Sequence, residues 1–258
     1  MSITQPKCAP SKFHEKKKTG YCISHKTLNE LLEQFNDDNK PINGSKKDKI
    51  EYLLMKAKCN NEHCLITASF AKNNNELINN TYRPIGPANS TDWLGTDDIN
   101  NILRQYENVF DNFKYIGTVP MDFYDLNVPF YPKFSSIDYN SHTIYAMVIN
   151  LDYHYQSGSH WVALYIDKDK NSIYYFDSNG NYPPEEITNY INILDNILGN
   201  YKFYYNELKH QYSNTECGIY CITIIIAMLY GRQFEKLCSK RIADNLMKAF
   251  RKEFFNHK

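Results

Sequence analysis

The chain has 258 residues and a mass of 30.3 kDa, which is enough for one large domain or two modest ones, because single cores seldom exceed about 250–300 residues. Hydrophobic residues make up 42% and charged residues 22%, near the globular average, which excludes collagen-like, coiled-coil and wholly disordered chains. Lysine plus arginine and aspartate plus glutamate both total 29, so no net charge attracts nucleic acid or an anionic membrane.

The N-terminal third of the chain predicts a helical arm domain. Apolar residues recur every three or four positions over 24–35, which is typical of an amphipathic helix, and Thr27 is a suitable N-cap. A second helix is predicted over 46–56. The Asn-rich run at 73–80 is followed by prolines and a glycine, which is typical of a linker. We therefore expect the arm domain to occupy residues 1–85.

Residues 91–258 predict a second domain that mixes helices with strands. Thr96 or Asp97 can cap its first helix. The segment 217–230 is apolar on every side, which indicates a helix buried in the core. No apolar run in the sequence reaches the roughly 18 residues that a membrane span needs. The other predicted elements are strands over 142–151, 160–167, 171–178 and 202–207, and a helix over 184–198.

The second and third of these strands are separated by a short polar turn and are predicted to form a β-hairpin. Paired positions in an antiparallel hairpin have a constant sum, so a turn centred between Lys168 and Asp169 pairs His160 with Asp177. A turn centre shifted by one residue leaves the two side chains as diagonal neighbours on the same face. In both cases the carboxylate can orient the imidazole. An incidental cross-strand pair is the alternative that the pairing alone leaves open.

Cys217 is predicted to be the first residue of the buried helix, where unpaired backbone N–H groups and the helix dipole favour a thiolate. Gly218 permits close approach of another segment. Gln211, six residues upstream, carries an amide that can donate to a developing oxyanion. Cys217 alone is compatible with a small residue in a buried helix, but with His160 and Asp177 these groups complete an acyl-transfer site.

The order and spacing of these residues resemble the SUMO-protease-like cysteine peptidases of clan CE. This family includes ubiquitin-like-protein-specific proteases, the adenovirus proteinase and core-protein proteases of large DNA viruses. The matching motifs are HWVALYID, YYFDSNG and HQYSNTECGIY, with TDWLGTDDINNIL upstream. The resemblance is strongest to the polyprotein-processing proteases of large DNA viruses such as African swine fever virus. It implies an α+β fold: a rearranged papain-like core over 91–258, in which a central helix packs on a small, mainly antiparallel sheet.

The same resemblance implies a role for each site residue: Cys217 as nucleophile, His160 as general base and acid, Asp177 as orienting acid and Gln211 as oxyanion donor. The viral relatives carry Asn at the position of Asp177. The chain has two tryptophans, Trp93 and Trp161, at positions where the family lines a narrow channel for a Gly-Gly substrate. Flat indole rings leave space for residues without side chains, which predicts Gly-Gly-Xaa specificity. Two buried core tryptophans are the alternative.

By this resemblance the protein is a cysteine endopeptidase that needs no cofactor and processes viral structural polyproteins during virion maturation. Such an enzyme would act in the host cytoplasm, at the viral factory, and in the virion. The same site would serve a protease for SUMO or another ubiquitin-like modifier. A clan acetyltransferase, which would need an acetyl donor, and a non-catalytic binding module are the further alternatives.

The cysteines and lysines outside this site carry weaker predictions. Residues 1–10 lack the apolar stretch of a secretory signal, so we expect a reducing compartment and seven free thiols. The lysine triplet at 16–18 gives only weak support for contact with nucleic acid. We predict no metal, because no repeated CxxC pair supports the one zinc candidate. The ligands of that candidate would be Cys22, Cys59, His63 and Cys64.

Overall fold

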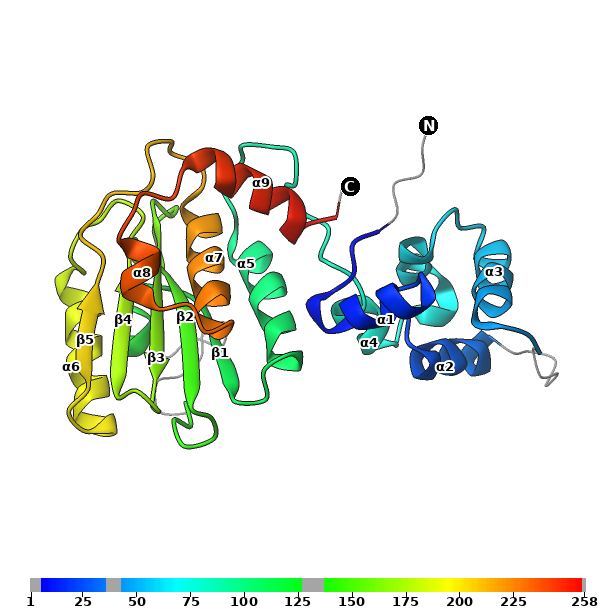
Figure 1. Ribbon diagram of the computed structural model, residues 1–258, viewed down its shortest axis with the longest axis horizontal. Helices are drawn as coiled ribbons and strands as arrows, with labels where there is room; N and C mark the ends of the chain where they lie inside the picture. Colours follow the sequence, from blue (N-terminus) through cyan, green and yellow to red (C-terminus); the bar gives the residue numbers. More distant parts are fainter. Residues whose placement is uncertain (1–5, 36–42, 127–136, 257–258) are drawn as a thin grey trace. The chain divides into compact units, whose positions relative to one another are not determined.

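The computed structural model describes residues 6–35, 43–126 and 137–256 (Figure 1). The chain divides into two compact units: unit 1, with residues 1–86 and 253–258, and unit 2, with residues 87–252. No helix in these described ranges is long and apolar enough to cross a membrane.

Unit 1 is helical. Leu28, Leu31 and Leu32, on the predicted apolar stripe, are buried in its core. The predicted cap at Thr27 is wrong, because Ser24 Oγ accepts the Thr27 N–H at 3.1 Å and the helix begins before Thr27, which is buried within it. The helices of unit 1 are α1 (Phe13–Thr19), α2 (His25–Phe35), α3 (Lys46–Ala57) and α4 (Asn75–Asn80), with 3-10 turns at Pro10–Lys12, Glu62–Thr67 and Ser69–Ala71.

The last described residues of the chain pack within unit 1. Asn256 Nδ2 donates to the carbonyls of Lys7, at 3.1 Å, and Arg83, at 2.8 Å. The Lys7 N–H donates in return to Asn256 Oδ1 at 2.7 Å. Gly86 lies against the buried ring of Phe255, where a Cβ would come within 2.2 Å of a ring carbon. These contacts explain why the C-terminal residues belong to unit 1, although the sequence predicted them as part of the domain over 91–258.

Two disulfides cross-link unit 1, and the prediction of seven free thiols is therefore wrong. Cys8 bonds to Cys22 with Cα atoms 5.3 Å apart, and Cys59 bonds to Cys64 with Cα atoms 5.6 Å apart. The bonds use every sulfur of the zinc candidate. Packing has brought together cysteines that spacing alone could not pair. Three cysteines remain free: Cys217, Cys221 and Cys238.

Unit 2 is built on a five-stranded sheet whose strands follow chain order from β1 to β5. The central pairs β2–β3 and β3–β4 are antiparallel, and the outer pairs are parallel. The chain crosses through the helix α6 (Glu185–Leu198) between β4 and β5, which lets those strands run in the same direction. The predicted α+β fold is confirmed, with a mixed sheet. The strands are β1 (Phe113–Pro120), β2 (Ile144–Asn150), β3 (Trp161–Asp167), β4 (Ser172–Phe176) and β5 (Lys202–Tyr205).

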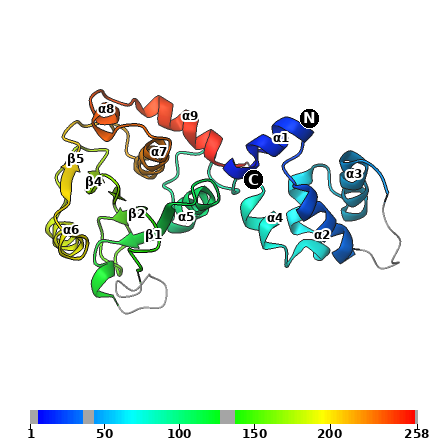
Figure 2. The same cartoon turned by 60° about the horizontal axis from the view of Figure 1, so that its bottom comes forward.

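The sheet of unit 2 lies between two helical layers (Figure 2). On one face Tyr145 and Leu164 pack with Leu194 of α6 (Glu185–Leu198). The other face packs against α7 (Cys217–Leu229), in which ten of 13 residues are buried. The prediction of a buried helix is thus confirmed. The remaining helices are α5 (Thr96–Leu103), α8 (Phe234–Cys238) and α9 (Asp244–Phe254), with 3-10 turns at Arg104–Asn108 and Phe123–Asp125.

Candidate active site

The β3–β4 hairpin carries His160 and Asp177 just beyond its open end. Its register pairs Asp167 with Ser172, which places the turn centre one residue later than direct pairing of His160 with Asp177 requires. The two residues are therefore diagonal neighbours, the second arrangement that the sequence allowed. His160 Nε2 lies 2.5 Å from Asp177 Oδ1, so the imidazole and the carboxylate are hydrogen-bonded.

The carboxylate of Asp177 is fully buried and is held by backbone donors. The Asn179 N–H donates to Oδ1 at 2.8 Å and the Asn181 N–H to Oδ2 at 3.3 Å. The Asn206 side chain accepts the Asp177 N–H at 2.9 Å and donates to its carbonyl at 2.7 Å. Burial favours a raised pKa, but the hydrogen bond and charge of His160, with the backbone donors, lower the pKa of Asp177 below its ordinary value. The carboxylate is therefore ionised at neutral pH.

Cys217 is the first residue of α7 and is almost completely buried. The Cys217 thiol interacts with the His160 ring, and this interaction acts to raise the pKa of His160. Burial favours a lower pKa, but the bonds to Asp177 and Cys217 outweigh it and raise the pKa of His160 to about 9. A protonated imidazole is thus favoured at neutral pH, and it lies beside a thiol at the first residue of α7, where the N–H groups of a helix start can stabilise negative charge.

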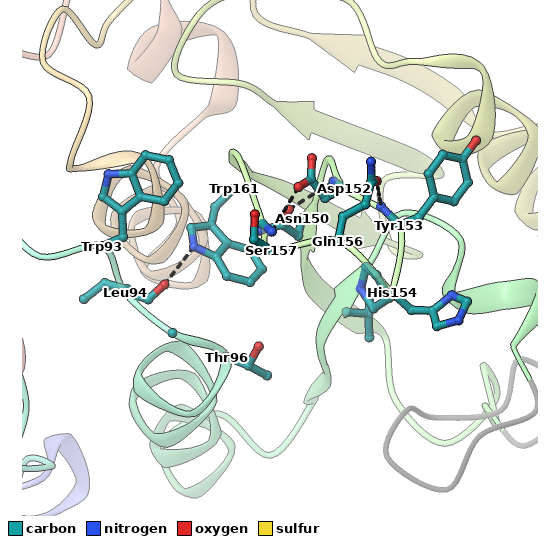
Figure 3. Close-up of a pocket in the computed structure, with 14 residues that line it drawn as sticks. Trp93, Leu94, Thr96, Asn150, Asp152, Tyr153, His154, Gln156, Ser157 and Trp161 are labelled. Carbon is teal, nitrogen blue, oxygen red and sulfur yellow. Dashed lines mark hydrogen bonds between the residues drawn. The ribbon is translucent and has the colours of Figure 1, made fainter.

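Gly218 allows α7 to begin against the segment that leads into α5. A Cβ at this position would lie 3.2 Å from Leu94 Cδ1 and 3.3 Å from Leu94 Cβ, which is tighter than most real Cβ contacts. The Leu94 carbonyl accepts the Trp161 Nε1–H at 2.9 Å (Figure 3). Close packing at Gly218 therefore holds the start of α7 beside the segment that orients Trp161.

Trp93 and Trp161 line the same cavity, which has a volume of about 340 Å³ (Figure 3). Trp161 is 8% exposed, whereas Trp93 is 49% exposed. The alternative of two buried core tryptophans is therefore wrong for Trp93. The β2–β3 loop over 152–158 forms another wall of the cavity and ends two residues before His160.

Sequence reasoning missed the residues that shape this loop. Asn150 Oδ1 accepts the N–H groups of Asp152, at 3.0 Å, and Ser159, at 3.2 Å. The Asp152 carboxylate accepts the Gly158 N–H at 2.9 Å and the Ser159 hydroxyl at 2.6 Å. The polar, glycine-containing run between two strands was the available signal for the loop. Its hydrogen bonds give the cavity a fixed wall directly before His160.

Gln211 is buried beside the segment that follows Asp177. Its backbone N–H donates to the Ser178 carbonyl at 2.9 Å. Its side chain accepts the Ser178 hydroxyl at Oε1, at 2.7 Å, and donates from Nε2 to the Ser213 carbonyl at 2.6 Å. The structure thus ties Gln211 to the chain segment that carries the triad carboxylate. Its role as an oxyanion donor stays a prediction.

A buried ion pair directly before Cys217 was also missed. Arg251 Nε donates to Glu216 Oε2 at 3.0 Å, and both residues are at most 1% exposed. Arg251 also donates to the carbonyls of Thr215 and Asp92, each at 2.9 Å. It therefore fixes the chain before the nucleophile and the segment that leads into α5. An acid next to a predicted buried helix was the only signal for this pair in the sequence.

Comparison with known proteins identifies the family of the chain. Residues 132–258 match the model of the Ulp1 protease family, C-terminal catalytic domain. A protein of Acanthamoeba polyphaga mimivirus named as a thiol protease is 33% identical over 234 residues, covering 88% of this chain and 74% of the relative. An African swine fever virus protein named as a SUMO-1 cysteine protease is 26% identical over 232 residues, covering 76% of this chain and 83% of the relative. A crystal structure of the African swine fever virus protease superposes with a TM-score of 0.71 at 24% identity, covering 98% of this chain and 96% of that chain.

A buried thiol at a helix start, bonded to an imidazole that a carboxylate holds, has the chemistry of a cysteine hydrolase. The family match and the sequence identity to the mimivirus relative show which family of cysteine hydrolases this is. The chain belongs to the Ulp1 protease family and is a SUMO-protease-like cysteine protease. The likeness to the African swine fever virus crystal structure shows that the two proteins share a fold.

Proposed function

We propose that the protein is an endopeptidase that cleaves after small residues in Gly-Gly-Xaa sequences, with Cys217, His160 and Asp177 as its catalytic triad. The observation that carries this proposal is the hydrogen bond between Asp177 and His160, together with the interaction of the Cys217 thiol with the same imidazole. Each group has the ionisation that its role needs: an anionic acid, a cationic imidazole and a thiol at a helix start.

In the proposed reaction the Cys217 thiolate attacks the substrate carbonyl carbon, and the carbonyl oxygen becomes negative. The Gln211 amide donates a hydrogen bond to that oxygen. Protonated His160 transfers its proton to the leaving amine, the C–N bond breaks, and a thioester remains. Neutral His160 then takes a proton from a water molecule that attacks the thioester. Collapse of this second intermediate releases the acid and restores the thiolate beside protonated His160.

The tryptophan pair supports a preference for small residues before the cleaved bond. Trp161 directly follows His160, and its indole is held by the Leu94 carbonyl. Trp93 presents half of its surface to solvent at the same cavity. Flat rings on the walls of a channel leave room for a glycine main chain and exclude branched side chains. Replacement of either glycine in a Gly-Gly-Xaa peptide by Leu should lower kcat/KM by about 10²-fold.

We assign the enzyme a structural polyprotein as its substrate, processed in the host cytoplasm and the virion. Similarity to thiol and cysteine proteases of two large DNA viruses supports this assignment. The second candidate is a SUMO conjugate, which is favoured by similarity to the African swine fever virus protein named as a SUMO-1 cysteine protease. A comparison of cleavage rates distinguishes the two candidate substrates. Faster cleavage of a SUMO conjugate than of a Gly-Gly-Xaa peptide would favour the second candidate.

The triad can be tested by thiol replacement with a matched control. Cys217→Ala should abolish hydrolysis of a fluorogenic Gly-Gly peptide while the melting temperature changes little, because one small group is removed from a helix start. Cys238→Ala, at the free thiol of α8, should retain full kcat/KM. Hydrolysis that persists in folded Cys217→Ala would overturn the proposed function.

A further inference from the structure

Ser178 joins the acid of the proposed triad to His210 and Gln211 through three hydrogen bonds, two of which are to Gln211. It is fully buried and directly follows Asp177. Its carbonyl accepts the N–H groups of His210 and Gln211, each at 2.9 Å. Its hydroxyl donates to Gln211 Oε1 at 2.7 Å. One residue therefore holds both the backbone and the side chain of Gln211 against the end of β4.

These contacts select one orientation of the Gln211 amide. Oε1 faces the Ser178 hydroxyl, and Nε2 donates to the Ser213 carbonyl at 2.6 Å. A flipped amide would place Oε1 against the Ser213 carbonyl, and two acceptors cannot bond to each other. One of the two Nε2 hydrogens is used by Ser213. The other has no acceptor among the residues that the structure describes.

We propose that Ser178 is a positioning residue that aims this second N–H of Gln211 at the oxygen that becomes negative during catalysis. The inference rests on the proposed function, because it takes Gln211 as the oxyanion donor. A donor stabilises the transition state most when it is already held in place and need not reorganise during the reaction. Ser178 touches no reacting atom, so its effect passes through Gln211.

The kinetic test is a double-mutant cycle on hydrolysis of a fluorogenic Gly-Gly peptide. Gln211→Ala should lower kcat by about 10²–10³-fold with little change in KM, the usual loss for one oxyanion donor. Ser178→Ala should lower kcat by about tenfold, because the amide remains but is held at fewer points. The double variant should match Gln211→Ala within about twofold, since Ser178 has no effect once the amide is gone.

Two controls separate positioning from a general disturbance of the site. Alkylation of Cys217 by iodoacetamide forms no oxyanion, so Ser178→Ala should leave its rate unchanged. Ser172→Ala removes a buried hydroxyl from the far end of β4, where Oγ donates to the Lys170 carbonyl at 2.9 Å, and should leave kcat unchanged.

Three outcomes would overturn the positioning role: an unchanged kcat in Ser178→Ala, additive losses in the cycle, or an equal loss of alkylation. An unchanged kcat in Gln211→Ala would also overturn it, and the peptidase assignment would still stand if Cys217→Ala were inactive. Activity of Cys217→Ala would instead remove the proposed function itself.

Discussion

Glu62 in unit 1 and Asp177 in unit 2 are both buried carboxylates that accept backbone N–H groups, with opposite consequences for their pKa values. Glu62 of unit 1 is 3% exposed and accepts the Cys22 N–H at 2.9 Å, yet burial outweighs its hydrogen bonds and raises its pKa. Asp177 of unit 2 is equally buried, but its bond to His160 lowers its pKa. The difference teaches that a bonded cation, rather than burial or backbone donors, distinguishes the proposed catalytic acid from a buried carboxylate that only binds the backbone before α2.

The largest expected difference between the two carboxylate sites is in catalysis. His160→Ala removes the cation beside Asp177 and the proton donor, and should lower kcat/KM by at least about 10⁴-fold. Glu62→Gln, in unit 1, should leave kcat/KM of the folded protein within about twofold, because Glu62 contacts no proposed catalytic group. Equal losses in peptide-hydrolysis assays of the two variants would break the comparison.

Arg251 supplies a second case of a buried carboxylate with a cation, and its removal should cost stability. Arg251→Met leaves Glu216 charged and buried without its partner, which should lower the free energy of unfolding by about 3–5 kcal/mol. Adding Glu216→Gln removes that charge and should restore part of the loss. Arg241→Met is the matched control, because its pair with Asp244 is 45% exposed at the arginine and is worth about 0–1 kcal/mol. Urea unfolding measures all three, and a loss under 1 kcal/mol for Arg251→Met would contradict the role of the pair.

The smallest effect is a shift in pH dependence. The pKa of His160 is raised from an ordinary 6.5 to about 9, so the folded state binds this proton more tightly than the unfolded chain. The stability from His160 is therefore complete below pH 6.5 and is lost as the pH rises through about 9. The alkaline limb of kcat/KM should lie near the same pH. Asp177→Asn removes one negative partner and should move that limb to lower pH.

Asp177→Asn should also reduce kcat/KM less than His160→Ala does, since Asn can still orient the imidazole through its amide oxygen. A pH–rate profile that keeps its alkaline limb in Asp177→Asn would show that Asp177 does not set the pKa of His160. Glu62 predicts a pH trend of the same sign for unit 1 but at lower pH: its raised pKa makes unit 1 less stable as the pH rises above its ordinary 4.5.

The sequence predicted the elements around the candidate site because their patterns are local. The buried helix at Cys217 and the hairpin after His160 both follow from apolar runs and a polar turn. The turn centre of the β3–β4 hairpin lies one residue from the position that pairs His160 directly with Asp177. The same turn residues can close more than one hairpin geometry, and the packing of both strand faces selects one of them. Both registers keep His160 and Asp177 on the same face, so their juxtaposition did not depend on the choice.

The missed features depend on contacts between distant parts of the sequence. Arg251 lies 35 positions after Glu216, and no periodicity marks a buried charge in advance. The Cys8–Cys22 bond depends on the packing of unit 1, whereas the expected reducing compartment predicted free thiols. Asn256 pairs with Lys7 across 249 positions, so the C-terminal residues could not be assigned to unit 1 from composition. Single-sequence patterns do not contain this information.

The most direct test of the central claim is to trap the nucleophile with a substrate-like electrophile. A peptide ending in Gly-Gly vinyl methyl ester should modify the wild-type protein once, and peptide mapping by mass spectrometry should place the adduct on Cys217. His160→Ala should slow this labelling strongly, because the Cys217 thiol loses the imidazole proposed to activate it. An adduct on Cys221 or Cys238, or labelling of Cys217 at the same rate in His160→Ala, would contradict a Cys217–His160 catalytic pair.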